Sequence, residues 1–182
     1  MMRDLSMHVL DIAQNSIHAK AKLVTITFLM DGHGWLTLTV QDDGTGMSPE
    51  LFQKVSDPFT TTRTTRKVGL GIPMLLQSAE ASGGRLALQS EPGKGTSLTV
   101  TFHLQHIDCP PMGNMCDTLL SLVILNPDQP EFLFTAFSPN QEASFDTRPL
   151  REAMGGLPLN GPDMIAWMKD AIEEEFKPIL EG

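Results

Sequence analysis

A strand that runs into two closely spaced glycines constrains this chain more than any other feature. Trp35–Val40, WLTLTV, alternates apolar residues with threonine, which predicts a strand, and Gln41–Met47, QDDGTGM, follows directly. Asp42 then lies at a strand end, where its carboxylate can accept a hydrogen bond from an exocyclic amine. Gly44 and Gly46 have no Cβ, so the backbone can pass close to a flat ring. The same pattern is also typical of glycine-rich hairpin turns without any ligand.

The composition predicts a folded, cytoplasmic protein. The chain has 182 residues, of which 41% are hydrophobic and 19% charged. This length suits one domain with an appendage, or two small domains, and the apolar content argues against global disorder. No apolar run is long enough to span a membrane, and the chain does not open with a secretory leader. We therefore expect no membrane association. Two cysteines do not form a disulfide framework, so we expect reduced thiols.

The net charge of −9 is concentrated in the second part of the chain. Residues 1–105 hold nine Lys/Arg and nine Asp/Glu, whereas residues 106–182 hold four and thirteen. This asymmetry predicts two regions with different tasks, residues 1–104 and residues 105–182. An acidic surface repels phosphates, so we expect no nucleic-acid partner. The acidic region is either a solvated surface or a docking surface for a protein partner or for a second copy in a homodimer.

The first predicted helix, Leu5–Ala19, carries an acid and an amide on one face. Its apolar residues recur at helical spacing, and Ser6 is a candidate N-cap. Asp11 and Asn15 lie four positions apart and so share a face. They are either a solvent-exposed pair or a polar face that meets a ligand. In the second case Asn15 offers an amide oxygen to Mg²⁺ and Asp11 offers a carboxylate to a water.

The middle of the chain predicts a phosphate-binding turn. Leu23–Met30 forms a predicted hairpin with the next strand, and a short helix follows over residues 48–55. Residues 56–67 form a threonine-rich predicted loop that ends in Gly-Leu-Gly before an apolar helix over residues 74–81. Backbone amides at such a helix start bind phosphate oxygens. Three cations just upstream can contribute to phosphate binding, and a solvated linker is the alternative: Arg63, Arg66 and Lys67.

The remaining chain alternates short predicted elements. We expect strands over residues 85–90, 97–104, 118–125 and 132–137, a Pro/Gly-rich joint after residue 105, and helices over residues 147–154 and 163–179. Four residues with soft ligand atoms also fall close together in sequence. They suggest either a redox or metal sensor or an incidental grouping: His103, His106, Cys109 and Cys116.

Four segments in this order resemble the ATP-binding domain of the GHKL superfamily, the histidine kinase-like ATPases of the Bergerat fold. The segments are LDIAQNSIHA, DDGTGM, DPFTTTRTTRKVGLGIPM and EPGKGTSLTVTFHL, within residues 3–104. The superfamily includes DNA gyrase B subunits, mismatch-repair ATPases, anti-sigma-factor kinases and sensor histidine kinases, and the third segment is most similar to the sensor kinases. The resemblance implies an α/β fold, a two-layer sandwich of helices on a mixed sheet. A small α+β C-terminal appendage would follow.

The resemblance also assigns roles to single residues. Asn15 matches the Asn that ligates Mg²⁺, Asp42 the Asp that accepts from the adenine amine, and Thr96 the Thr at the adenine end. Asp11 falls where hydrolysing members carry a Glu general base, so it is the candidate catalytic residue. The implied ATP-binding set is Asn15, Asp42, Gly44, Gly46, Met47, Arg66, Lys67, Gly69, Leu70, Gly71 and Thr96.

The function implied is that of a Mg·ATP-binding protein, either a slow ATPase or a protein kinase acting on a partner protein in bacterial signalling. A sensor histidine kinase needs a phosphoaccepting His on a long helix pair before this domain, but only fourteen residues precede Asn15. We expect His8 to be packed or solvated rather than phosphorylated. The alternatives are a nucleotide-gated interaction module with negligible turnover and the redox or metal sensor described above.

Overall fold

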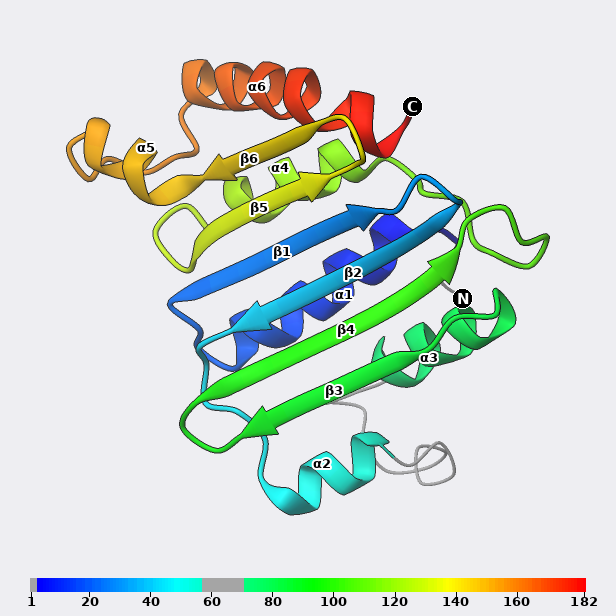
Figure 1. Ribbon diagram of the computed structural model, residues 1–182. Coiled ribbons are helices and arrows are strands. Elements are labelled where there is room, and N and C mark those ends of the chain that lie inside the picture. Colours follow the sequence, from blue (N-terminus) through cyan, green and yellow to red (C-terminus); the bar gives the residue numbers. More distant parts are fainter. Residues whose placement is uncertain (1–2, 57–70) are drawn as a thin grey trace.

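The computed structural model describes residues 3–56 and 71–182, which form one mixed sheet and the helices packed on it (Figure 1). The strands lie in the order β3-β4-β2-β1-β5-β6. β1 and β5 are parallel and all other neighbours are antiparallel. The strands are β1 (Leu23–Met30), β2 (Trp35–Asp42), β3 (Leu86–Glu91), β4 (Gly95–His103), β5 (Glu131–Phe137) and β6 (Glu142–Asp146). The helices are α1 (Leu5–His18), α2 (Pro49–Ser56), α3 (Gly71–Ala81), α4 (Met115–Leu125), α5 (Thr147–Ala153) and α6 (Pro162–Leu180).

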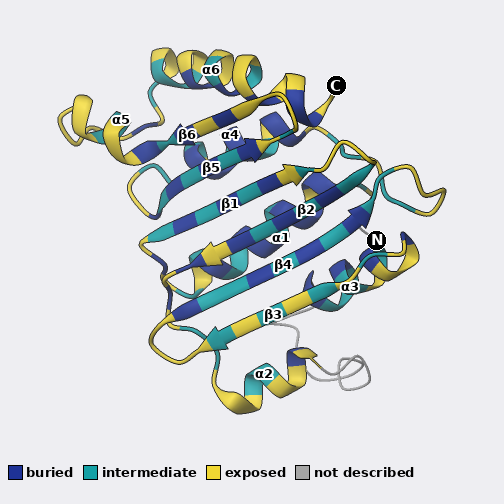
Figure 2. Cartoon of the chain, in the orientation of Figure 1, coloured by how far each residue is buried: buried dark blue, intermediate teal, exposed yellow. Residues whose placement is uncertain are grey.

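The strands bury one face and leave the other partly exposed. Val24, Ile26 and Phe28 of β1 are fully buried, whereas the threonines between them are only half-buried (Figure 2). α1 and α4 lie across the buried face (Figure 1). This alternation with a period of two is what a sheet covered on one side requires. The predicted two-layer α/β sandwich is confirmed.

The first helix begins at Leu5, and its cap lies two residues before the predicted one. Asp4 is the N-cap, and its Oδ1 accepts hydrogen bonds from the backbone N–H of Met7 at 2.9 Å and from the hydroxyl of Ser6 at 2.6 Å. The prediction that Ser6 is the cap is wrong, because Ser6 is already inside the helix and its hydroxyl binds the capping carboxylate. Aspartate and serine are about equally good caps, so composition alone does not separate them.

The predicted strand over residues 118–125 is also wrong, because this segment belongs to α4. Asn114 caps the helix by accepting from the backbone N–H of Asp117 at 3.1 Å. The side chains of Leu119, Leu122 and Val123 are buried at helical spacing. Nearly every residue of the segment is apolar, and such a run fits a buried strand as well as a buried helix.

The acidic region extends the sheet of the first region. β5 pairs in parallel with β1, and β6, which was not predicted, pairs with β5. The two regions therefore contribute strands to the same sheet, and the predicted division after residue 104 falls between β4 and α4. Across the described ranges, no helix has both the length and the apolar character needed to cross a membrane.

Candidate functional site

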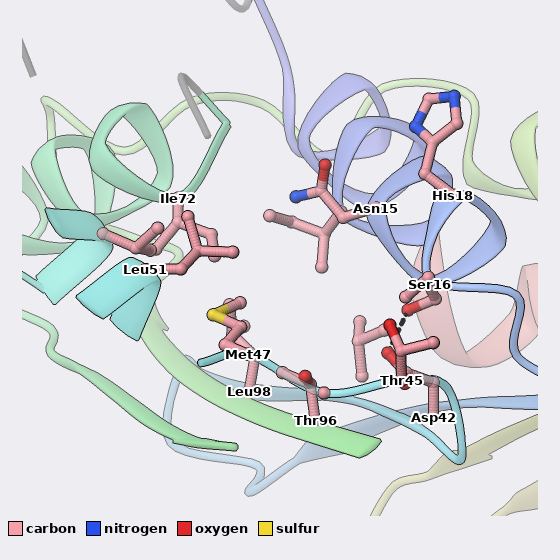
Figure 3. A pocket seen from close by; sticks show the side chains of 15 residues that line it. Asn15, Ser16, His18, Asp42, Thr45, Met47, Leu51, Ile72, Thr96 and Leu98 are labelled. Carbon is pink, nitrogen blue, oxygen red and sulfur yellow. Dashed lines mark hydrogen bonds between the residues drawn. The ribbon is translucent and has the colours of Figure 1, made fainter. Parts of the chain in front are cut away.

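A cavity of about 280 Å³ lies between α1, the end of β2, α2, the start of α3 and β4 (Figure 3). Its walls are mostly apolar, and its polar groups come from α1, from the end of β2 and its following loop, and from β4. The lining residues are Ile12, Asn15, Ser16, His18, Ala19, Val40, Asp42, Thr45, Gly46, Met47, Leu51, Val55, Ile72, Thr96 and Leu98.

Asp42 is the carboxylate of this cavity and is held rigidly at its wall. Its Oδ2 accepts a hydrogen bond from the Ser16 hydroxyl at 2.6 Å, and its Oδ1 accepts from the backbone N–H of Gly44 at 2.9 Å. Asp42 is only 9% exposed. A carboxylate has about four acceptor positions, so two remain available to a ligand. The arrangement can therefore present a fixed acceptor to a donor group such as an exocyclic amine.

The neighbouring Asp43 points elsewhere and has a structural role. Its Oδ1 accepts hydrogen bonds from the backbone N–H groups of Lys22 and Leu23 at 2.7 and 3.0 Å. It thereby joins the start of β1 to the end of β2. Of the two consecutive carboxylates, only Asp42 faces the cavity.

The two glycines after Asp42 are required by contacts between backbone segments. A Cβ at Gly46, whose φ is +68°, would lie 2.1 Å from the carbonyl oxygen of Glu91 in the β3–β4 turn. A Cβ at Gly44 would lie 2.7 Å from the carbonyl oxygen of Ala19 at the end of α1. The loop is thus clamped between α1 and the β3–β4 turn, and this packing alone accounts for both glycines. Contact of either glycine with a bound ring stays a prediction.

The β3–β4 turn braces the far wall of the cavity. The Ser90 hydroxyl accepts a hydrogen bond from the backbone N–H of Met47 at 2.8 Å. It also lies at hydrogen-bond distance, 2.8 Å, from the Thr96 hydroxyl. Thr96 also pairs directly with Asp42 across β4 and β2. The predicted residues Met47 and Thr96 are therefore brought to the cavity together with Asp42.

Asn15 and Asp11, which share a face of α1, have different surroundings. Asn15 lines the cavity, and Figure 3 shows its amide between the ends of α1 and α3. Asp11 does not line the cavity as the described residues define it. Its carboxylate lies against the first residue of α3, since a Cβ at Gly71 would be 1.9 Å from Asp11 Oδ2. Asn15 is thus placed to meet a ligand, whereas Asp11 faces a helix N-terminus.

The character of the cavity matches a flat, mostly apolar ligand with a few polar groups. Met47, after β2, and Leu98 of β4 line one side, and Leu51 of α2 and Ile72 of α3 line another (Figure 3). Small-molecule sites are commonly about 300–1,000 Å³, and this cavity, at about 280 Å³, is near the lower bound, which suits part of a nucleotide such as its base. One fixed carboxylate in apolar walls fits adenine, which offers an amine at the edge of a flat ring.

Several predicted residues lie outside the described part of the chain, including the cations expected at the phosphates. They are Arg63, Arg66, Lys67, Gly69 and Leu70.

The structure does not support the metal-site alternative for His103, His106, Cys109 and Cys116, and it agrees with an incidental grouping. Across the residues that the structure describes, no three His, Cys, Asp or Glu side chains are arranged to hold a metal ion. His103 instead contacts Trp35, with ring centroids 4.9 Å apart. Cys116 is buried in α4, and burial raises the pKa of its thiol to about 11. Burial also raises the pKa of Cys109, so neither thiol favours the thiolate form that binds metals, and His106 is left without these ligands.

Some lining residues were not predicted. Ser16 and Thr45 are neighbours of predicted residues, and the adjacency of Ser16 to Asn15 is a signal that could have identified it. His18 lies one turn further along α1. The apolar walls from α2 and α3 carry no signal beyond ordinary amphipathic spacing.

Comparisons with known proteins agree with this geometry. The family described as histidine kinase-, DNA gyrase B-, and HSP90-like ATPase has a sequence model that matches residues 3–106. The chain is 37% identical over 68 residues to the sensor histidine kinase DcuS of Escherichia coli (strain K12). It is 33% identical over 99 residues to sporulation kinase C of Bacillus subtilis (strain 168).

These matches cover 37% and 53% of this chain, but only 12% and 22% of the two kinases. The chain therefore matches a small part of each curated relative. Among solved structures, the N-terminal domain of a DNA repair protein is similar with a TM-score of 0.54 and 14% sequence identity. That likeness covers 79% of this chain and 53% of the other, and it concerns the fold alone.

Proposed function

The chain belongs to the histidine kinase-, DNA gyrase B-, and HSP90-like ATPase family, and from this membership we propose that its cavity binds Mg·ATP with the adenine amine at Asp42. The observation that carries the proposal is a fixed, buried carboxylate in an apolar cavity of suitable size. The amine would donate to a free acceptor position of this carboxylate. Met47, Leu98 and Ile72 would cover the ring, and Thr96 would lie beside Asp42 at the adenine end.

Asn15 is the proposed protein ligand of Mg²⁺. Magnesium usually keeps several waters and takes one or two protein oxygens together with substrate phosphates. A single amide oxygen at the rim of the cavity fits this mode of binding, because the ATP phosphates would supply further oxygens. When bound, Mg·ATP supplies the transferable γ-phosphoryl group. The chain's own contribution is to orient the nucleotide through Asp42 and Asn15.

The leading activity is slow ATP hydrolysis or phosphoryl transfer to a partner protein in bacterial signalling. The similarity of this chain to parts of two kinases supports it, and the acidic region supplies a surface for the partner. Asp11 is the proposed general base or water-orienting group. A cytoplasmic location and a homodimer also stay proposals.

A specific observation favours a second candidate, a nucleotide-gated interaction module with negligible turnover. The Asp11 carboxylate lies against Gly71 at the start of α3 rather than in the cavity. A carboxylate is stabilised near a helix N-terminus, so Asp11 can join α1 to α3 instead of activating a water. In this case nucleotide binding would change the conformation of the protein, and the nucleotide would not be hydrolysed.

Two measurements test these proposals. Calorimetry with Mg·ATP on wild type and Asp42→Asn tests binding: we expect binding in the wild type and a loss of affinity of about 10-fold or more in the variant, because a charged hydrogen-bond acceptor is lost. Equal affinities would overturn the placement of adenine. Phosphate release by wild type and Asp11→Ala then separates the two candidates. A wild-type rate above background that falls in Asp11→Ala supports the ATPase, and equal background rates support the module.

A further inference from the structure

One edge of the sheet lies at β6, at the opposite edge from β3 and three strands away from β2, which lines the cavity. β6 pairs with β5 through Glu142–Asp146 and is the last strand in the sheet order. No other strand in the described ranges pairs with its outer edge. An edge strand presents unpaired backbone N–H and C=O groups, and an extended peptide can bind to them as an added strand.

A groove of about 610 Å³ runs along this edge, between β6 and α6. On α6 it is lined by Trp167, Ala171 and Glu175, which are spaced by four residues and share one helix face. Trp167 is 54% exposed and Phe137, on the strand side, is 37% exposed. The small side chain of Ala171 leaves room for a backbone, while Trp167 offers a large apolar contact at one end.

The charges of the groove select a basic occupant. Two carboxylates line it, Glu142 and Glu175, and none of its described lining residues is Lys, Arg or His. Asp170 and Glu174 are exposed at neighbouring positions of α6, and Figure 2 shows this surface of the helix largely exposed. Carboxylates at a sheet edge disfavour the addition of an acidic strand, because like charges opposite each other are destabilising. A strand that carries Lys or Arg would gain electrostatic attraction instead.

Charge disfavours a second copy of the chain at this edge. Antiparallel pairing of two β6 strands about Ser144 would place Glu142 of each copy opposite Asp146 of the other, whose charge Arg148 offsets only in part through an ion pair at 2.8 Å. Like charges directly opposite each other in a sheet are destabilising. The whole acidic region carries the −9 net charge, which adds to the repulsion between copies.

We infer that the β6 edge and the adjoining face of α6 form a docking groove for an extended basic segment of a partner protein. The segment adds to the sheet beside β6, places an apolar side chain against Trp167 and directs Lys or Arg toward Glu142 and Glu175. This inference deepens the partner-directed part of the proposed function and rests on it only for the existence of a partner. It does not require nucleotide binding.

The test uses Trp167 fluorescence in the full chain. The sequence has two tryptophans, so Trp35→Phe leaves Trp167 as the sole reporter. The probe is an acetylated, amidated heptapeptide of alternating lysine and valine. We expect a saturable blue shift of Trp167 emission at low salt. The same peptide with prolines in place of its central valines keeps its charge but loses amide donors, and we expect it to cause no saturable shift.

Charge variants locate the binding site. Glu142→Gln/Glu175→Gln should weaken peptide binding several-fold, since two nearby opposite charges are removed. The matched control, Glu50→Gln/Glu80→Gln, removes two exposed carboxylates from α2 and α3 and should leave the affinity unchanged.

Three outcomes would overturn the inference: no saturable shift, equal binding of the proline peptide, or equal weakening by both charge pairs. A dimer that Trp167→Ala dissociates would make a second copy the occupant and would also overturn it. Asp42→Asn should bind the peptide like the wild type. Failure of peptide binding alongside intact ATP binding would therefore reject the groove and leave the proposed function standing.

Discussion

Two regions of the sheet are built from the same kind of strand but expose different chemistry. Over the inner strands β2 and β4, loops and helices enclose a mostly apolar cavity around one braced carboxylate, Asp42. At the β5–β6 end, the last strand is left open beside an acidic helix. The first arrangement suits a small ligand and the second suits an extended polypeptide. The comparison teaches that one continuous sheet can hold a ligand cavity over its inner strands and leave an edge strand, β6, open for the proposed docking.

Removing a large core side chain from the acidic end tests whether both ends form one cooperative unit. Phe134 of β5 is fully buried, so Phe134→Ala should lower the free energy of unfolding by about 3–5 kcal/mol. Urea unfolding can be followed by the fluorescence of Trp35 in β2 or of Trp167 in α6, in single-tryptophan variants. The two transitions should coincide both with Phe134 and with Phe134→Ala.

Phe137→Ala is the matched control, because this side chain lies at the exposed end of the same strand and should cost much less. Two separate transitions, with only that of Trp167 shifted by Phe134→Ala, would show that the ends unfold independently.

Crowding at the cavity end gives the next largest effect. Gly46→Ala adds a Cβ 2.1 Å from a backbone oxygen at a residue with positive φ, so we expect a destabilisation of about 2–4 kcal/mol. Gly93→Ala is the control that measures the cost of a positive φ alone, without the steric contact. Its φ is +78° and nothing lies within 4 Å of the added Cβ, so it should cost only about 1–2 kcal/mol. Equal unfolding free energies for the two variants would contradict the conclusion that the loop at Gly46 is packed tightly against the β3–β4 turn.

The hydrogen bond that braces Asp42 has a smaller effect. Ser16→Ala removes a donor from a buried carboxylate, so the free energy of unfolding should fall by about 1–2 kcal/mol. Nucleotide affinity should fall with it, because Asp42 is held less rigidly. Ser97→Ala, on the neighbouring strand β4 but outside the cavity lining, should leave the affinity unchanged. A Ser16→Ala protein that binds nucleotide like the wild type would show that the brace does not serve the cavity.

The smallest effect concerns pH. Burial lowers the pKa of His8 below 6.5, although Asp11 and Asp4 partly oppose this shift. Between 6.5 and the lowered pKa the unfolded chain binds more protons than the folded one, so this histidine makes stability fall as pH decreases. His8→Gln should flatten that slope in unfolding experiments between pH 7 and 5. An unchanged slope in His8→Gln would contradict this assignment.

The sequence predicted the cavity end better because its signals are local. Asp42, Gly46 and the preceding strand are contiguous, and alternation identified β2 correctly. α4 was mistaken for a strand because its residues are apolar on nearly every side. β6 was missed because it has only two buried apolar residues, Ala143 and Phe145, and its pairing depends on a distant strand. Long-range pairing of this kind leaves no pattern in a short segment.

The most direct test of the account compares ATP with purine riboside triphosphate, which lacks the exocyclic amine, in wild type and Asp42→Asn. If Asp42 accepts from that amine, the wild type should prefer ATP by about 10- to 100-fold in calorimetric titrations with Mg²⁺. Asp42→Asn should then show a clearly smaller preference for ATP, because its neutral amide oxygen is a weaker acceptor than the carboxylate. A wild type that does not discriminate, or a variant that keeps the full preference for ATP, would contradict the placement of adenine at Asp42.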